Sequence, residues 1–365
     1  MIFIPDSIFM TLTFIFLALY IAVIGFLTWL GARGEQGRDG YMLGGRRLGF
    51  FSFAASMTAG WVSGTTAIAT AALAYDGTGV MVWFTLSLFL GLGFMALYAG
   101  RIRRISAEQN CYTMPGLLRR MFGRGVQMAT ALITAFIYIV FIVMELMVGG
   151  ALLSALTGWP DMACVAFLAV VVAAYLMVGG FSVIIKTDWL QFALICLLAF
   201  GFIFLADYSA VEKNPVEITF QDALGFPLTF SLGIMLINLP GLIMPADFWQ
   251  RIFAARTDRD AQFGILLFAA LMAAFWMAMT LLIVATGQIE PGLTDREIFV
   301  KAMELFLTPE FLPFAFIAFV AVLMSSLDSF MFVTGQSIMN DGLMRFFPQL
   351  ARRPRLYSRI GIVIV

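Results

Sequence analysis

Long apolar runs separated by short polar segments make up nearly the whole of this chain. A helix needs about 20 predominantly apolar residues to cross the hydrocarbon core of a bilayer. By that rule the sequence predicts nine membrane-spanning helices, over residues 8–31, 50–74, 79–100, 127–155, 161–178, 188–207, 227–249, 262–287 and 311–343. A tenth apolar run starts near Ile360 and reaches Val365, where the sequence stops. We expect an all-α polytopic membrane protein whose tenth span is cut short.

Composition excludes several classes of protein. Of the 365 residues, 62% are hydrophobic and only 12% are charged, whereas a soluble domain carries about 25% charged residues. The formal net charge of zero argues against a nucleic-acid partner. The chain has no histidine, so His-based metal sites and Ser-His catalytic triads are excluded. Since there is also no Ser-Lys or paired-carboxylate arrangement, we do not expect an enzyme.

The basic residues orient the predicted spans. If the N-terminus lies outside, only Lys213, Arg296 and Lys301 of the 22 Lys and Arg residues fall in outer loops, as the positive-inside rule requires. The first span follows a segment without basic residues and lacks a small-residue cleavage site, so we interpret it as a retained helix and not a signal peptide. We expect an integral protein of the bacterial inner (plasma) membrane with its N-terminus outside.

Two of the predicted spans contain helix-weakening residues at mid-membrane. In the second span, residues 56–66 read Ser-Met-Thr-Ala-Gly-Trp-Val-Ser-Gly-Thr-Thr. Such a stretch favours either local unwinding, which frees backbone groups to bind an ion or substrate, or close packing of helices through small residues. The seventh span carries Pro240 and Gly241. Each interrupted span is followed by an unusually long one, which indicates two structural repeats with a binding site between them.

The ninth span carries the densest polar stripe, which is Ser325, Ser326, Asp328, Ser329, Gln336, Ser337 and Asn340. Two adjacent hydroxyl groups are suitable ligands for a hard monovalent cation when carbonyl oxygens supply the rest. The alternative is hydrogen bonding between helices. A carboxylate at this depth must face a cavity or a partner, so Asp328 is a candidate for the ion path or for capping a broken helix.

Two further carboxylates lie at or near membrane depth. Glu145, alone in the fourth span, is a candidate counter-ion for a cationic substrate, a protonatable coupling group, or a neutral acid bonded to a broken helix. Asp188 stands at the predicted start of the sixth span. Because a helix N-terminus stabilises a carboxylate, capping explains Asp188 as well as a role in the ion path does.

Several ordered motifs resemble those of the sodium:solute symporter family, which includes sodium-coupled carriers of proline, sugars, pantothenate, choline and iodide. They are Tyr41-Met-Leu-Gly-Gly-Arg-Arg, Gly179-Gly-Phe-Ser with Thr187-Asp-Trp-Leu-Gln191, Gln250-Arg251, and Met324-Ser-Ser-Leu-Asp-Ser329. The resemblance covers essentially the whole chain. It implies a leucine-transporter-like inverted five-plus-five helix repeat with one extra N-terminal helix. The domains would be residues 1–48 (extra helix and loop), 49–225 (first repeat) and 226–365 (second repeat, incomplete in its fourth helix).

The resemblance also implies a set of site residues. By position, the sodium ligands would be the carbonyls of Ala59, Val62 and Val322 and the hydroxyls of Ser325 and Ser326. Asp188 matches a family aspartate on the sodium exit route, and we group Asp328 with it. The implied substrate-binding residues are Trp61, Ser63, Gly64, Glu145 and Asn238. Trp61 with Glu145 favours a cationic or quaternary-ammonium solute through cation–π and charge contacts.

These observations predict a sodium-coupled secondary transporter of a small organic solute that works by alternating access. Its partners would be the solute and the lipid bilayer, and sodium would be the co-transported ion. The alternative is a sensory input module whose solute site regulates a histidine kinase missing from the C-terminus. The acidic residue that is common in the family after the Tyr112-Thr-Met-Pro loop is absent here.

Overall fold

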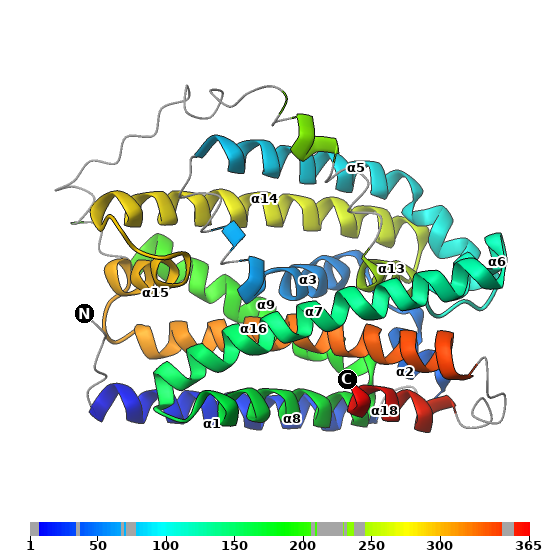
Figure 1. Cartoon of the computed structure of the whole chain (residues 1–365), viewed down its shortest axis with the longest axis horizontal. Coiled ribbons are helices and arrows are strands. Elements are labelled where there is room, and N and C mark those ends of the chain that lie inside the picture. The colour runs from blue at the N-terminus through cyan, green and yellow to red at the C-terminus, as the bar shows by residue number, and fades with distance from the viewer. Residues whose placement is uncertain are drawn as a thin grey trace.

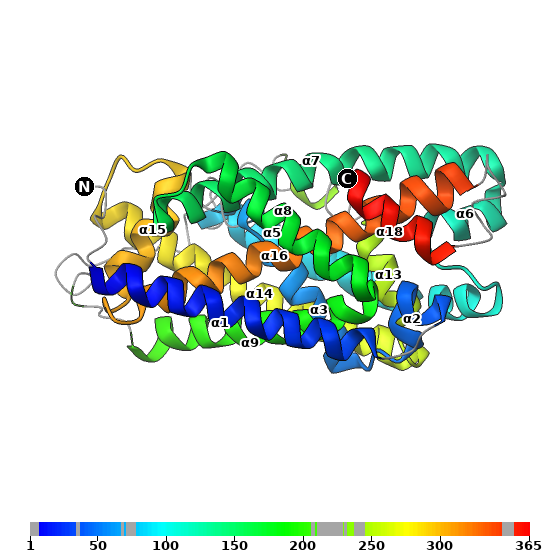
Figure 2. The same cartoon turned by 90° about the horizontal axis from the view of Figure 1, so that it is seen from below.

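The computed structural model describes residues 7–33, 37–66, 69–70, 78–205, 209, 229, 232–236, 245–344 and 354–365. In this part of the chain the long elements are helices that run roughly along one axis of the molecule (Figure 1). Two segments of the chain far apart in sequence, α1 and α8, lie side by side along one edge, and α5 and α14 lie side by side along the other (Figures 1 and 2).

Seven of the described helices are long and apolar enough to cross a membrane. They correspond to the predicted first, third to sixth, eighth and ninth spans, which confirms those elements. Their bounds are α1 Ser7–Ala32, α5 Thr78–Glu108, α7 Arg124–Thr157, α8 Asp161–Gly179, α9 Phe181–Phe200, α14 Asp258–Ile289 and α16 Leu312–Gln336. Two of them continue as π-helical segments, α9 into η2 (Gly201–Leu205) and α16 into η3 (Ser337–Leu343).

The remaining described helices are shorter. They are α2 Arg38–Leu43, η1 Gly44–Arg46, α3 Phe50–Trp61, α6 Met114–Phe122, α13 Ala246–Ala254, α15 Asp295–Phe306 and α18 Pro354–Ile364. The predicted second span begins as α3. Most of the predicted seventh span, with Asn238, Pro240 and Gly241, lies outside the described residues. The tenth apolar run is part of α18, which begins earlier than predicted, at Pro354.

The predicted start of the sixth span was wrong. Helix α9 begins at Phe181, directly after the Gly180 turn that ends α8. Asp188 therefore lies inside α9, where the first turn has already ended, and it is fully buried. Capping of the α9 N-terminus is excluded as its role. The prediction failed because Lys186 and Asp188 broke the apolar run, although the backbone continues through both.

Helix α16 lies at the centre of the bundle. Of its apolar window 94% is buried, against 28% to 44% in the other six long helices. It packs against helices from both ends of the sequence, namely α1, α3, α7, α8, α9, α13 and α18. A helix surrounded by protein on all sides can carry polar side chains, because they face other helices and not lipid. The polar stripe of the ninth span is therefore inside the protein.

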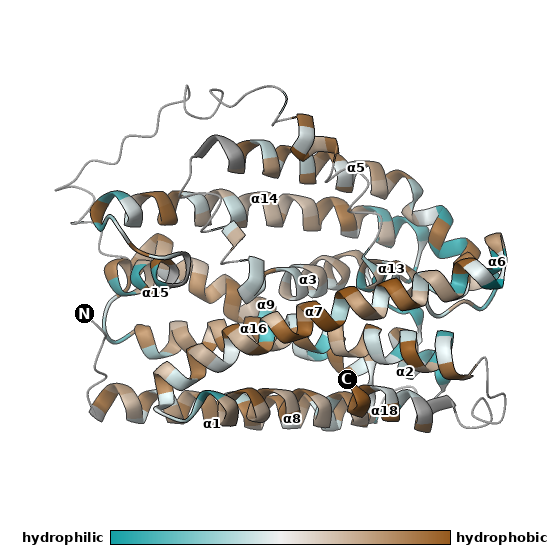
Figure 3. Ribbon diagram, in the orientation of Figure 1, coloured by the Kyte–Doolittle hydropathy of each residue, from teal (hydrophilic) through white to brown (hydrophobic). Residues whose placement is uncertain are grey.

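Hydrophilic residues gather at the ends of the bundle (Figure 3). One end carries α2, α6 and α13, and most described arginines lie there, so we call it the basic end. At this end Arg46 donates hydrogen bonds to Ser106 Oγ at 3.0 Å and to the carbonyls of Phe253 at 3.2 Å and Cys111 at 3.0 Å. The backbone of Leu48 pairs with that of Ala254 and Arg256 at 3.0 and 2.9 Å. These bonds fasten the end of α13 to the segment that precedes α3.

The turn between α8 and α9 requires glycine. Gly180 has a φ of +56°, in the region that favours glycine, and its N–H donates to the Leu176 carbonyl at 2.8 Å. A Cβ atom at this position would lie 2.6 Å from the Tyr41 carbonyl oxygen. Backbone from the α2 segment thus fits directly against the turn.

We expect Gly180→Ala to lower the apparent melting temperature of the purified protein more than Gly158→Ala does. Gly158 also has a positive φ, of +71°, but no atom lies within 4 Å of a Cβ built there. Gly158→Ala incurs the left-handed backbone penalty of roughly 1 kcal/mol. Gly180→Ala incurs a larger one, because φ +56° with ψ −139° is a region essentially restricted to glycine, and it adds the collision with Tyr41. Equal melting temperatures, measured by thermal unfolding in detergent, would contradict the packing of Tyr41 on this turn.

Candidate functional site

The second span is broken at the predicted place. Helix α3 ends at Trp61, and Val62 is extended, with φ −74° and ψ 94°. The N–H of Ser63 donates to Thr66 Oγ1 at 2.8 Å. A new helical turn starts at Gly64, and the Ser63 hydroxyl accepts from the Thr66 N–H at 3.0 Å. Local unwinding, one of the two alternatives that the sequence left open, is therefore what this segment does.

Glu145 of α7 binds the start of this new turn. Its carboxylate accepts from the N–H groups of Gly64 at 3.2 Å and Thr65 at 3.1 Å, and from the Thr65 hydroxyl. A helix N-terminus stabilises negative charge through such donors. Of the three roles predicted for Glu145, this geometry matches bonding to the broken helix. The turn packs closely against its neighbours, since a Cβ at Gly64 would lie 2.1 Å from Leu323 Cδ2 and 2.9 Å from Val148 Cγ1.

The hydroxyls of α16 face the break in α3. Ser325 and Ser326 are fully buried. Ser326 Oγ donates to the carbonyl of Gly60 at 2.9 Å, and Ser325 Oγ donates to Asp188 Oδ1 at 3.1 Å. Ala59, Val62 and Val322, whose carbonyls complete the implied ligand set, are buried too. The structure thus brings together α3, α9 and α16 at one level.

The chemistry of these oxygen donors fits a monovalent cation. Hydroxyl and carbonyl oxygens carry no net charge, so they suit a hard ion of low charge better than a divalent metal. Among the described residues no group of three or more His, Cys, Asp or Glu side chains is arranged to hold a metal ion. These neutral oxygens, with Asp188 beside them, therefore suit a monovalent cation.

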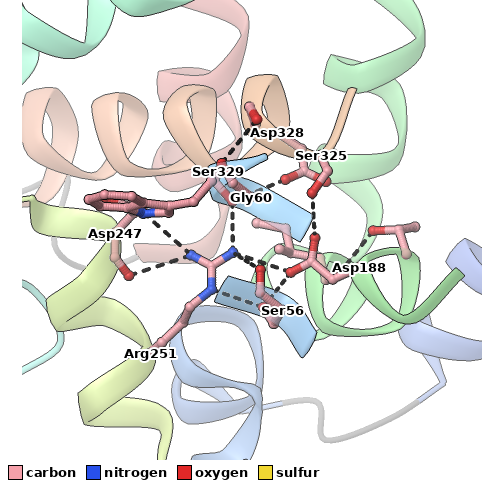
Figure 4. A network of polar contacts seen from close by, with 12 residues as sticks. Ser56, Gly60, Asp188, Asp247, Arg251, Ser325, Asp328 and Ser329 are labelled. Atoms are coloured by element: carbon pink, nitrogen blue, oxygen red, sulfur yellow. Dashed lines mark hydrogen bonds and ion pairs between the residues drawn. The ribbon is translucent and has the colours of Figure 1, made fainter. Parts of the chain in front are cut away.

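A buried arginine that sequence reasoning did not assign to the site lies next to these donors. Arg251 reaches from α13 into the core with a side chain that is 1% exposed (Figure 4). Its Nη2 lies 3.2 Å from Asp188 Oδ2 and 2.9 Å from Ser329 Oγ. Its Nε donates to Ser56 Oγ at 2.8 Å, and Ser56 in turn donates to Asp188. We call Arg251, Asp188, Ser56 and Ser329 the arginine cluster.

Asp247 of α13 connects the arginine cluster to one more helix, α7, and makes a second contact with α3. It lies one helical turn before Arg251, with Nη1 and Oδ2 3.9 Å apart. Trp61 Nε1 donates to Asp247 Oδ2 at 3.1 Å, and the Tyr138 hydroxyl of α7 donates to Oδ1. In the sequence, Asp247 and Arg251 stand four residues apart. This spacing is typical of an ion pair on a helix and could have pointed to both residues.

Asp328 does not cap the broken helix. Its Oδ2 accepts from the Tyr175 hydroxyl of α8 at 2.8 Å and its Oδ1 from Ser329 Oγ at 3.2 Å. The Ser329 hydroxyl also accepts a hydrogen bond from Arg251 Nη2, so it links Asp328 to the arginine cluster. In the sequence, Tyr138 and Tyr175 each place a single hydroxyl group within an apolar span, which was the available indication that they bind a buried polar partner.

The implied substrate residues are brought together only in part. Ser63 and Gly64 form the start of the new helical turn, and Glu145 of α7 binds it. Trp61 points to Asp247, and its ring makes edge contacts with Phe248 and Phe268, each with centroids 5.7 Å apart. Because Trp61 and Glu145 already bind protein groups, their geometry adds no support for a cationic solute. Asn238 lies outside the described residues.

A family model described as the sodium:solute symporter family matches residues 41–365. The chain belongs to this family. Membership makes it a transport protein of the membrane that carries sodium together with its solute, and it supports a function other than catalysis. No curated protein matches the chain.

A solved structure is similar to the family member described here. It is described as the substrate-bound outward-open state of a Na⁺-coupled sialic acid symporter. The match covers 97% of this chain and 78% of that chain, with a TM-score of 0.78 and 16% identity. The similarity confirms the expected leucine-transporter-like helical fold. The domain bounds at 48/49 and 225/226 stay predictions.

We expect Arg251→Met to destabilise the symporter strongly, since removing one partner of a buried ion pair costs about 3–5 kcal/mol. The double variant Asp188→Asn/Arg251→Met should lose less than the sum of the two single changes, because it leaves no unpaired charge at Asp188. Apparent melting temperatures in detergent measure both. The exposed pair Arg104–Asp258 serves as a control and should show coupling below about 1 kcal/mol. Additive effects at Arg251 and Asp188 would contradict the buried pair.

We expect Glu145→Ala to lower the melting temperature through loss of the bonds to Gly64 and Thr65, by roughly the 0.5–2 kcal/mol of a lost helix cap. Glu145→Gln keeps one carbonyl acceptor and should lose less. Glu310→Gln, a change on an exposed turn, is the control and should leave the melting temperature unchanged. If Glu145→Ala instead kept full stability and only changed which solutes bind, the capping assignment would be wrong.

Proposed function

We propose that this symporter accumulates a small organic solute by alternating access, with sodium bound between the broken end of α3 and the hydroxyls of α16. The observation that carries the proposal is the hydrogen bond from Ser326 Oγ to the Gly60 carbonyl at the break. It brings the interrupted backbone of α3 and two hydroxyls of α16 to one place inside the protein. The ligands would be the carbonyls of Ala59, Val62 and Val322 with the hydroxyls of Ser325 and Ser326.

Sodium binding in this site would join α3 to α16. Because the ion would bind carbonyls of α3 together with the Val322 carbonyl and the hydroxyls of α16, it would stabilise the arrangement in which the two helices lie close together. A solute that needs the same arrangement binds more tightly when sodium is present, and by reciprocity sodium binds more tightly when solute is present. The proposed solute site lies at the start of the new helical turn, at Ser63 and Gly64, with Trp61 and Glu145. Asn238, which lies outside the described residues, stays part of the predicted substrate-binding set.

The orientation of the protein belongs to the same proposal. The basic end would face the cytoplasm, in line with the positive-inside rule, and the N-terminus would lie outside. Sodium and solute would then leave past Asp188 toward the basic end.

We expect the protein in proteoliposomes to take up one of a panel of solutes (choline, betaine, proline, a sugar or pantothenate) only with an inward sodium gradient. Ser325→Ala/Ser326→Ala should raise the sodium concentration for half-maximal uptake at least about tenfold, which corresponds to roughly 1.4 kcal/mol. It should also remove the rise in melting temperature that sodium gives the parent protein.

The matched control is Ser154→Ala, which removes a hydroxyl that donates to the Trp159 carbonyl at 2.8 Å, away from the site. It should keep the sodium dependence of the parent. Uptake that is equal in sodium and in potassium, or a double serine variant with unchanged sodium dependence, would overturn the proposed site.

A further inference from the structure

Arg251 lies almost one helical turn nearer to the basic end than the proposed sodium ligands. On α3 it contacts Ser56, three residues before Ala59, and on α16 it contacts Ser329, three residues after Ser326. Three residues are a little less than one turn, or roughly 4.5 Å along a helix. The two helices run in opposite directions here, so both offsets point toward the basic end.

We propose that Arg251 is the inner gate of the sodium path: its guanidinium holds Asp188 while sodium is enclosed, and sodium leaves only after the guanidinium moves away. This inference rests on the proposed function above, and it assigns a role to a residue outside the proposed ligand set. Arg251 acts on sodium through Asp188 and is a positioning residue.

The first support is that Asp188 stands between the sodium ligands and the guanidinium. One carboxylate oxygen accepts from Ser325 at 3.1 Å, and the other lies 3.2 Å from Arg251 Nη2. A sodium ion at Ser325 and the guanidinium are therefore competing cations for one carboxylate. Since the guanidinium is covalently attached to α13, its hold on Asp188 depends on the position of that helix.

The second support is that Arg251 fills the space along the path. A Cβ built at Gly60 would lie 3.2 Å from Nη2 and 3.5 Å from Ser329 Oγ, so the guanidinium lies against the bare backbone of α3. The guanidinium carbon of Arg251 lies 5.9 Å from the centroid of the Phe181 ring. Asp188 and Arg251 have almost no exposed surface. The guanidinium therefore fills the space between Ser56, Asp188 and Ser329, on the side of Ser325 that faces the basic end.

The third support is that Arg251 is carried by α13, whose side chains reach α2, α3 and α7 while its C-terminal end is bound by Leu48 and Arg46. Asp247 binds Tyr138 of α7 and Trp61 of α3, and Gln250 donates to the Met42 carbonyl. A shift of α13 would break these bonds and withdraw Arg251 at once. A planar guanidinium suits this place because it donates to Ser56, Asp188 and Ser329 simultaneously, whereas an ammonium group is a compact point charge.

The test measures ²²Na⁺ exchange across proteoliposomes without any solute, for the parent, Arg251→Gln and Arg251→Lys. Arg256→Gln, which changes an exposed arginine just beyond α13, is the matched control. We expect Arg251→Gln to raise solute-independent exchange at least fivefold and to abolish accumulation, while sodium still raises its melting temperature. Arg251→Lys should raise exchange at least twofold, and Arg256→Gln should equal the parent.

Arg251→Lys keeps a positive charge in the core, so it serves if the Gln variant does not fold. Exchange at the parent rate in a folded Arg251 variant that still binds sodium would overturn the gate and leave Arg251 as a structural ion pair. A different result would contradict the proposed function, namely that the parent protein shows no sodium-driven uptake of solute.

Discussion

A positive charge buried in a membrane protein is the constraint on which the rest of this core depends. The Arg251 guanidinium is 1% exposed, and an uncompensated charge there would cost several kcal/mol. The protein compensates by directing Asp188, Asp247, Ser56 and Ser329 at it. These partners come from α3, α9, α13 and α16, so four helices must be placed correctly for one charge to be tolerated. The same four helices surround the proposed sodium ligands, which ties the ion site to the stability of the core.

Helix α16 carries several tasks because its residues point in different directions. Ser325 faces Asp188 and Ser326 faces the carbonyl of Gly60, whereas Asp328 faces Tyr175 of α8. A helix can offer distinct polar groups to several neighbours only when it is enclosed, and α16 is the most buried long helix among those described. Its central position thus lets one short sequence serve the sodium ligands, the arginine cluster and the contact with α8.

Much of the fold follows from the length of apolar runs, since lipid imposes one length on every span. The break at residues 56–66 was also foreseeable, because glycine and small hydroxyl residues weaken a helix wherever they cluster. The start of α9 could not be foreseen, because two charged residues close together in a sequence usually indicate a loop. Asp188 is tolerated inside a buried helix only because Arg251 is its partner. Asp247 and Tyr138 were missed for the same reason: each is a single polar residue whose meaning lies in a partner more than 100 residues away along the chain.

The sequence by itself determined that this chain is a helical membrane protein, where seven of its long apolar helices lie and at which residues its second span is open to interruption. These properties depend on composition and local spacing, which act within one segment. Only the tertiary structure decided which polar groups meet: that Glu145 binds the new helical turn, and that Arg251 and Ser325 share Asp188. The physical reason is that a buried charge has no stable position by itself, so its role is fixed by the groups that packing brings within hydrogen-bond distance.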